Sequence, residues 1–457
     1  MTKWMSRGMT RGMPRRLFPL ALLLLPLTGS CGGGTDPGAP VGKVVLVGIE
    51  SLSLLQVETM VARGELPNFS RLLERGARAR TVSPDPLVAP MLWSTLLTGQ
   101  DAIKHQMTAA YVNTAQGIAL APSSMRTSPT LFQILGQEHQ LVASLGFPGT
   151  WPAEALNGFN LAHGALPSRF VQASEHSFVR TPGDRDAFPE SLLERATGHY
   201  TPVAEMDRAD TAPFFVLNEE EFTMLYDQPL GSIYRLENPP RDFAISLQRD
   251  AAQVALAQEL LGEFPLRLVG VHLELADALQ SVYWRAAWPD HYTIRADAQR
   301  RFSDTIDECY RRLDTWIGEL MQAAGEDAII CVVGDRGFGH GSNEMTGPDE
   351  EREIFPTIVN ESLLLLHGPG IRRGADLGTV HLVDVAPTLL SALDLPVGVE
   401  MDGSVLDAAF SDEFLSAHPR KGTESWTGDF RSSMRYPSEL RQAAEQSAAE
   451  SATEETP

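Results

Sequence analysis

The chain has 457 residues, of which 43% are hydrophobic and three are cysteines, and its 59 Asp and Glu residues outnumber its 37 Lys and Arg residues. The net charge of −22 argues against a general nucleic-acid-binding protein, because such proteins need a basic surface. Three cysteines cannot build a disulfide framework, and the hydrophobic content is that of a globular protein.

The N-terminal region has the pattern of a secretory signal. Residues 1–16 carry five basic residues and no acidic one, and residues 17–27 are apolar but too few for a membrane-spanning helix, which needs roughly 20 residues. Cys31 follows small residues, as in bacterial lipoprotein signals. We therefore predict a lipoprotein-type signal peptide over 1–30, lipidation of Cys31, and export to the bacterial cell envelope with a lipid anchor. The alternative is ordinary signal cleavage beside an incidental cysteine.

Apolar strand patterns alternate with helical patterns along the body of the chain. Strands are expected at 43–49, 328–333 and 363–366, and helices at 54–63, 67–75, 304–324 and 385–395. This alternation predicts an α/β fold, a three-layer α/β/α sandwich with a mainly parallel sheet. Ligands of such sheets gather at the carboxyl ends of strands, which makes Glu50, Asp277 and Asp335 the candidate site residues.

The predicted domain organisation has one large folded unit. After a flexible spacer over 31–42, the α/β domain covers 43–415. Residues 167–240 lack a clear hydrophobic period and are expected to form an insertion or cap. Residues 416–457 are rich in Ser, Ala and Glu and are expected to form an acidic disordered tail.

Four segments carry short motifs in a fixed order: Val44-Val-Leu-Val-Gly-Ile-Glu50-Ser51, Ala89-Pro-Met-Leu-Trp-Ser-Thr-Leu-Leu-Thr-Gly99, Asp277-Ala-Leu-Gln-Ser281-Val-Tyr-Trp284 and Val332-Val-Gly-Asp335-Arg336-Gly-Phe338. Together they resemble the alkaline phosphatase superfamily, specifically its type I phosphodiesterase/nucleotide pyrophosphatase branch. The resemblance implies an alkaline phosphatase-like fold. It also implies two metal ions, usually zinc, which would activate a Thr or Ser nucleophile for ester hydrolysis.

Carried over position by position, the resemblance shows a degenerate active site. Ala89 stands at the nucleophile position and has no group that can attack phosphorus. Of the metal-binding positions, Asp277 and Asp335 keep the family residue and Glu50 is a longer carboxylate. The three histidine positions are substituted, by Ser281, Arg336 and Ile358.

The sequence therefore predicts a catalytically inactive member of the superfamily, without a cofactor, that acts as a binding or interaction protein. Its partner would be an unidentified ligand or envelope protein, with no nucleic acid and with membrane contact only through lipidated Cys31. We hypothesise that Arg336 pairs with the three carboxylates and takes the place of the cation; otherwise it reaches solvent. Two alternative functions remain: an active metal-dependent phosphoric or sulfuric ester hydrolase with zinc in a non-standard site, and a structural assembly subunit.

Other residues of the chain carry groups that could support catalysis. Ser94 and Thr95 are expected to be hydroxyls that pack a helix, and His340 is expected on a flexible loop. His272 and Glu274 alternate along a strand and could face the cleft. Cys309 and Cys331 are expected to be buried free thiols. The alternative is a disulfide between them, which requires Cα atoms within about 7 Å.

Overall fold

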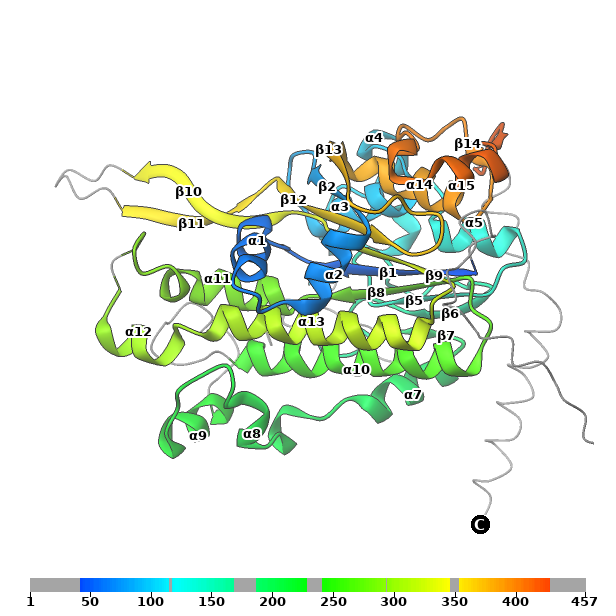
Figure 1. Ribbon diagram of the computed structural model, residues 1–457. Coiled ribbons are helices and arrows are strands. Elements are labelled where there is room, and N and C mark those ends of the chain that lie inside the picture. The colour runs from blue at the N-terminus through cyan, green and yellow to red at the C-terminus, as the bar shows by residue number, and fades with distance from the viewer. Residues whose placement is uncertain are drawn as a thin grey trace, which may run out of the picture. The chain divides into compact units, whose positions relative to one another are not determined.

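The centre of the computed structural model is a nine-stranded sheet with the strand order β13-β2-β12-β9-β1-β8-β5-β6-β7 (Figure 1). The structure describes residues 42–114, 117–167, 186–227, 241–292, 294–345 and 353–427. The strands of this sheet are β1 (Lys43–Ile49), β2 (Ala77–Val82), β5 (Val142–Leu145), β6 (Gly158–Leu161), β7 (Ala187–Phe188), β8 (Leu268–Leu273), β9 (Ala328–Gly334), β12 (Glu361–His367) and β13 (Ala375–His381).

The five strands β9, β1, β8, β5 and β6 form a continuous parallel block. Strand β12 runs antiparallel to β9 and β2, and β7 runs antiparallel to β6. Strands β1, β8 and β9 are almost entirely buried because helices cover both faces of this block. The predicted α/β fold with a mainly parallel sheet is confirmed.

Two helical layers complete the sandwich. The larger hydrophobic core holds one face of the sheet against α1 (Leu54–Ala62), α2 (Pro67–Arg75), α10 (Arg241–Glu263), α11 (Leu275–Ala287) and α13 (Thr305–Ala324). The second core holds the other face against α3 (Ala89–Thr98), α5 (Leu131–Gln137) and α14 (Val385–Ala392). Figure 1 shows α10, α11 and α13 below the sheet and α3, α5 and α14 above it.

Short elements extend from these layers. Three two-stranded sheets pair β3 (Tyr111–Thr114) with β4 (Gly117–Leu120), β10 (Gly337–Met345) with β11 (Glu353–Val359), and β14 (Val397–Gly398) with β15 (Gly422–Thr423). Within the described ranges, the remaining α-helices are α4 (Ala102–His105), α7 (Ser191–His199), α8 (Arg208–Thr211), α9 (Glu219–Asp227), α12 (Ala296–Phe302) and α15 (Asp412–Ala417).

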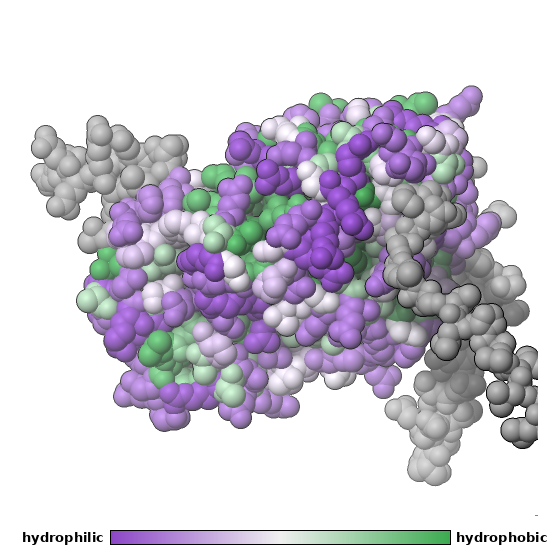
Figure 2. All heavy atoms as spheres, in the orientation of Figure 1, coloured by the Kyte–Doolittle hydropathy of each residue, from purple (hydrophilic) through white to green (hydrophobic). Residues whose placement is uncertain are grey.

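One surface groove of about 470 Å³ lies between α1 and the strands β2, β12 and β13. Apolar side chains line it, including Leu54, Val61 and Leu73, because α1 and α2 leave the edge of the sheet partly uncovered. Figure 2 shows the corresponding apolar patch near the middle of this face. Glu58 and Arg78 line the same groove.

The segment predicted as an insertion or cap is described over 186–227. Helix α7 packs against α10, and Phe215, which precedes α9, contacts Tyr283 of α11 and Phe302 of α12. The described part therefore lies on the outside of the layer that contains α10 (Figure 1), and its origin as an insertion stays a prediction. The rest of the segment lies outside the described residues.

The folded domain continues beyond the predicted boundary at 415. Strand β15 pairs in parallel with β14, and the indole nitrogen of Trp426 donates a hydrogen bond to the Pro396 carbonyl at 3.1 Å. Trp426 is buried in the second core. The prediction of a disordered tail starting at 416 was thus wrong for 416–427, because one aromatic side chain anchors a segment of otherwise polar composition. Residues 428–457 lie outside the described residues.

The predicted signal peptide, the predicted spacer up to residue 41 and Cys31 also lie outside the described residues, so they remain predictions. Among the helices of the described ranges, none combines the length and hydrophobicity needed to cross a bilayer.

Candidate functional site

The candidate site lies where the three central strands of the sheet end. Glu50 follows β1, Asp335 follows β9, and Asp277 lies in the first turn of α11, just after β8. Since β1 is hydrogen-bonded to both β8 and β9, the parallel register brings all three carboxylates to one edge. All three side chains are buried.

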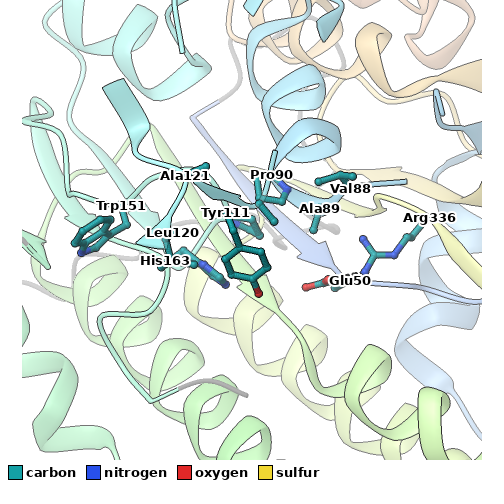
Figure 3. A pocket seen from close by; sticks show the side chains of 13 residues that line it. Glu50, Val88, Ala89, Pro90, Tyr111, Leu120, Ala121, Trp151, His163 and Arg336 are labelled. Atoms are coloured by element: carbon teal, nitrogen blue, oxygen red, sulfur yellow. Dashed lines mark hydrogen bonds and ion pairs between the residues drawn. The ribbon is translucent and has the colours of Figure 1, made fainter. Parts of the chain in front are cut away.

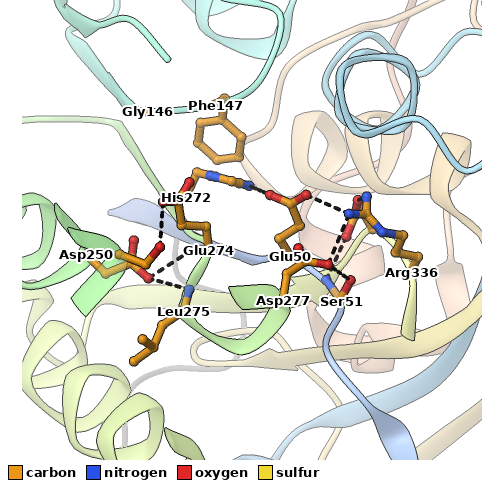
Figure 4. A network of polar contacts seen from close by, with 12 residues as sticks. Glu50, Ser51, Gly146, Phe147, Asp250, His272, Glu274, Leu275, Asp277 and Arg336 are labelled. Carbon is orange, nitrogen blue, oxygen red and sulfur yellow. Dashed lines mark hydrogen bonds and ion pairs between the residues drawn. The ribbon is translucent and has the colours of Figure 1, made fainter. Parts of the chain in front are cut away.

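Arg336 lies within this group of carboxylates. Its Nη1 donates to Asp335 Oδ2 at 2.6 Å, and its Nη2 donates to Glu50 Oε1 at 2.6 Å and to Asp277 Oδ1 at 3.3 Å (Figure 4). The side chain is only 6% exposed, so the alternative of a solvent-facing arginine was wrong. The predicted pairing of Arg336 with all three carboxylates is confirmed.

Ser51 donates hydrogen bonds to two of these three carboxylates. Its N–H donates to Asp335 Oδ1 at 3.0 Å, and its hydroxyl donates to Asp277 Oδ1 at 2.6 Å. Ser51 has φ +58°, a left-handed conformation that costs a non-glycine residue free energy. These two hydrogen bonds stabilise the turn that carries Glu50 into the site.

Burial changes the proton affinity of these groups. Desolvation, partly opposed by Arg336, raises the pKa of Glu50 from 4.5 to about 8, and raises that of Asp335 from 3.8 to about 6. Desolvation alone would lower the pKa of the Arg336 guanidinium, but the surrounding carboxylates outweigh it and raise the pKa. The arginine is therefore a permanent cation.

His272 connects this site with a second buried charge cluster. Its Nδ1 is 3.3 Å from Arg249 Nη2, which can only donate, so the neutral ring carries its proton on Nε2. That Nε2 lies 3.6 Å from Glu50 Oε2, and neither atom has a hydrogen-bond partner in the described structure. Desolvation, with Arg249 adding to it, lowers the pKa of His272 and keeps the ring neutral.

The second cluster consists of Arg249 and Asp250 on α10 together with Glu274. Arg249 Nη1 donates to Asp250 Oδ1 at 2.8 Å and lies 3.5 Å from Glu274 Oε2. Desolvation raises the pKa of Asp250 to about 8, against the opposing effect of Arg249. Of the two residues expected to share a cleft face, His272 points to Glu50, whereas Glu274 belongs to this second cluster.

The residues present do not fit the pair of metal ions that the fold family uses. Arg336 already makes hydrogen bonds to all three carboxylates, so a metal ion would have to displace it. The Ser281 hydroxyl donates to the Asp277 carbonyl of its own helix, and Ile358 is paired with Phe338 in the β10–β11 hairpin. In the described parts of the chain, no group of three or more His, Cys, Asp or Glu side chains is arranged to hold a metal.

A cavity of about 180 Å³ opens beside the carboxylates. Glu50 and Arg336 line one end of it, and Ala89, the first residue of α3, lines its wall (Figure 3). Trp93 of α3 packs edge-on against His272 with 4.9 Å between ring centroids, which fixes the helix against the site. Ala89, which the resemblance assigns to the nucleophile position, thus lies at the wall of this cavity and presents a methyl group.

The other candidate residues have structural roles. Ser94 and Thr95 are buried in α3, and Thr95 Oγ1 is 3.0 Å from His105 Nε2, in agreement with packing hydroxyls. His340 lies on strand β10, not on the expected loop, and stacks on His291 at 3.9 Å next to Trp284. Cys309 and Cys331 are buried free thiols, as predicted.

The sequence reasoning missed the Arg249–Asp250 pair, His163 and the aromatic residues Tyr111 and Trp151. These residues come from segments without a strand-end motif, and only the fold brings them near Glu50. A buried position for an Arg-Asp pair could have been suspected from the apolar periodicity of α10, but its partners could not.

A model of the type I phosphodiesterase/nucleotide pyrophosphatase family matches residues 44–358, which include the complete carboxylate–arginine site. The chain belongs to this family. The solved structures with similar folds include an inactive variant of murine ectonucleotide pyrophosphatase/phosphodiesterase 5 in complex with AMP. It has a TM-score of 0.47 and 10% identity, and the alignment covers 81% of this chain and 100% of that one.

A putative sulfatase from Bacteroides thetaiotaomicron VPI-5482 has a TM-score of 0.47 and 11% identity, over 84% of this chain and 76% of that one. Among curated proteins, a 2,3-bisphosphoglycerate-independent phosphoglycerate mutase from Prochlorococcus marinus is 34% identical over 112 residues. That match spans 22% of this chain and 18% of the mutase.

Proposed function

We propose that this chain is a catalytically silent member of its family, exported and held at the bacterial envelope by a lipid on Cys31, and that its altered cleft binds a ligand or a partner. One observation carries the proposal: the Arg336 guanidinium lies among Glu50, Asp277 and Asp335. A fixed cation hydrogen-bonded to all three carboxylates occupies the space among them, so a metal ion would have to displace the guanidinium in order to bind there. Ala89, in turn, supplies no nucleophile.

Purified protein should contain no stoichiometric zinc and should not hydrolyse a generic aryl phosphodiester above the background rate. The reason is that these residues provide neither a nucleophile nor bound metal ions that would stabilise the transition state. Metal analysis and a colorimetric assay with bis(4-nitrophenyl) phosphate check this, and the Asp335→Ala variant should behave like the wild type in the assay. Stoichiometric zinc together with turnover that Asp335→Ala abolishes would establish the alternative, an active ester hydrolase.

The membrane part of the proposal rests on Cys31, which follows a signal-like segment. In a bacterial host, the wild-type chain should incorporate labelled palmitate and sediment with membranes, and Cys31→Ser should lose the label and become soluble after export. Ordinary signal cleavage without lipidation would leave both chains unlabelled.

A further inference from the structure

The chain enters the folded domain at the edge of the sheet opposite to the carboxylate–arginine site. The Gly42 N–H donates to the Asp327 carbonyl at 3.1 Å, and Lys43 begins β1, which ends just before Glu50. The 7 residues of β1, at about 3.3 Å each, separate the two edges by roughly 23 Å. The predicted spacer over 31–42 reaches at most about 40 Å when it is fully extended. A lipid on Cys31 would therefore attach the domain through the edge where β1, β8 and β9 begin, which we call the entry edge.

Three exposed arginines lie together at the entry edge. Arg71 and Arg75 are one turn apart on α2, and Arg373 lies in the turn between β12 and β13. Their common neighbour is His367, whose Nδ1 lies 3.4 Å from the Arg75 carbonyl oxygen. Desolvation, and after it the charges of the three arginines, lower the pKa of this ring. His367 ends β12 and pairs with Ile330 of β9, so the arginine cluster lies about two strand spacings, roughly 10 Å, from β1.

The arginine cluster differs from the arginines next to it, because none of its members pairs with a carboxylate of the described residues. Its neighbours are paired: Arg372 with Asp412 at 2.7 Å, and Arg78 with Asp376 at 2.8 Å. A cation in the last turn of a helix is favoured by the helix dipole, which accounts for Arg75 but not for the other two arginines. The cluster therefore presents guanidinium groups whose hydrogen-bond donors are available to an external anion.

The local charge at this part of the entry edge is positive, although the protein has a net charge of −22. Its acidic residues are Glu74 on α2 and Glu326 and Asp327 before β9. Lys43 and Arg267, at the starts of β1 and β8, add to the three charges of the arginine cluster. Charges farther away than a Debye length of about 8–10 Å are largely screened, so a charged surface responds to this local balance more than to the total.

We propose that the arginine cluster is a membrane-contact surface: Arg71, Arg75 and Arg373 bind the phosphates of anionic lipid headgroups, and the carboxylate–arginine site faces away from the bilayer. This inference rests on the proposed lipid anchor, to which it adds a second contact. Guanidinium groups match phosphate oxygens with paired N–H donors, and an anionic leaflet attracts basic side chains near its surface. The acidic remainder of the molecule is repelled by the same lipids, which favours the orientation with the cluster toward them.

The test measures which arginines the bilayer covers. The chain from Cys31 to Pro457, which contains every described residue, is coupled to a maleimide lipid in vesicles. Cys309 and Cys331 are buried, so the coupling is directed to Cys31. Exposed arginines are then modified with phenylglyoxal, an uncharged reagent, and the rate at each residue is measured by mass spectrometry. Vesicles of phosphatidylcholine alone are compared with vesicles of phosphatidylcholine and phosphatidylglycerol in equal amounts.

On the anionic vesicles we expect the arginine cluster to be modified at least about five-fold more slowly than on the neutral vesicles, the preference that one basic side chain gains at an anionic surface. Arg300 of α12 is the reference and should react equally on both. Tyr292, just before α12, has its hydroxyl 3.0 Å from His340 Nδ1 on β10. Helix α12 therefore lies on the side of the β10–β11 hairpin, which follows the carboxyl end of β9 (Figure 1).

Two matched double variants assign the effect to the cluster. Arg71→Gln/Arg373→Gln should abolish the lipid-dependent difference at Arg75, because two of the three headgroup contacts are lost. Arg295→Gln/Arg300→Gln removes the same charge beside and within α12 and should leave the difference at Arg75 unchanged. All four substituted side chains are exposed, so both variants should keep the circular-dichroism spectrum of the wild type.

Equal modification of the cluster on the two kinds of vesicle would overturn the proposal and leave this basic surface to an acidic protein partner. Slower modification of Arg300 in place of the cluster would show that the opposite edge faces the bilayer, and it would also overturn the proposal. The maleimide lipid supplies the anchor, so these results do not depend on the palmitate experiment. An unlabelled Cys31 in that experiment overturns the natural lipid anchor, whereas an unprotected cluster overturns only the membrane-contact surface.

Discussion

Replacing Arg336 by methionine should lower the free energy of unfolding by about 3–5 kcal/mol, because removal of one partner leaves buried charge without compensation. Arg336 is 6% exposed and bonds Glu50, Asp277 and Asp335, so its loss affects three carboxyl groups at once. Urea unfolding followed by circular dichroism measures the change. The free energy of unfolding of Arg336→Lys should lie between those of the wild type and Arg336→Met, since one ammonium cannot reproduce the forked geometry of a guanidinium.

Arg78→Met is the matched control for this measurement. Arg78 forms an ion pair with Asp376 at 2.8 Å, but both side chains are at least half exposed. Exposed pairs contribute little, and we expect a loss of no more than about 1 kcal/mol. Equal losses for the Arg336 and Arg78 variants would show that Arg336 does not compensate the buried carboxylates.

The free energy of unfolding should decrease by about 3 kcal/mol as the pH rises from about 6.5 to about 8. Glu50 and Asp250 have folded-state pKa values of about 8, far above their usual values of 4.5 and 3.8. The folded protein therefore holds about two protons that the unfolded chain has already released. The stability they confer is complete below the unfolded-state pKa and is lost as the pH rises through the folded-state value.

Below pH 6.5 the free energy of unfolding should change less steeply with pH. Desolvation lowers the pKa of His105 to about 4 and that of His163 to about 3, and it also lowers that of His272. These rings stay neutral in the folded state, whereas in the unfolded chain they take up protons as the pH falls. The histidines therefore lower the free energy of unfolding on acidification, which offsets the gain from the protonated carboxyl groups.

Unfolding midpoints in urea at several pH values check this profile. Glu50→Gln and Asp250→Asn should each remove about half of the decrease between pH 6.5 and 8, since an amide mimics the protonated acid without titrating. A stability that rises over this interval would contradict the assignment of the two protons.

The sequence alone was sufficient for the fold class and for the edge of the sheet where the site lies. The apolar runs of β1 and β9 predict buried strands, a further strand is expected before Asp277, and the residues after parallel strands must meet at one edge. This places Glu50, Asp277 and Asp335 together without knowledge of any side-chain position. The alanine at position 89, where the resemblance implies a nucleophile, could likewise be read directly from the motif.

Only the tertiary structure decided what surrounds these carboxylates. The side chain of Arg336 could have pointed to solvent or into the site. A strand pattern predicts where a residue lies along the backbone but not the direction of a long side chain. Arg249 is 23 residues from His272 in the chain and still contacts it, because α10 packs beside β8. The end of the domain was also decided by packing: Trp426 buries enough apolar surface to order a polar segment whose composition predicted disorder.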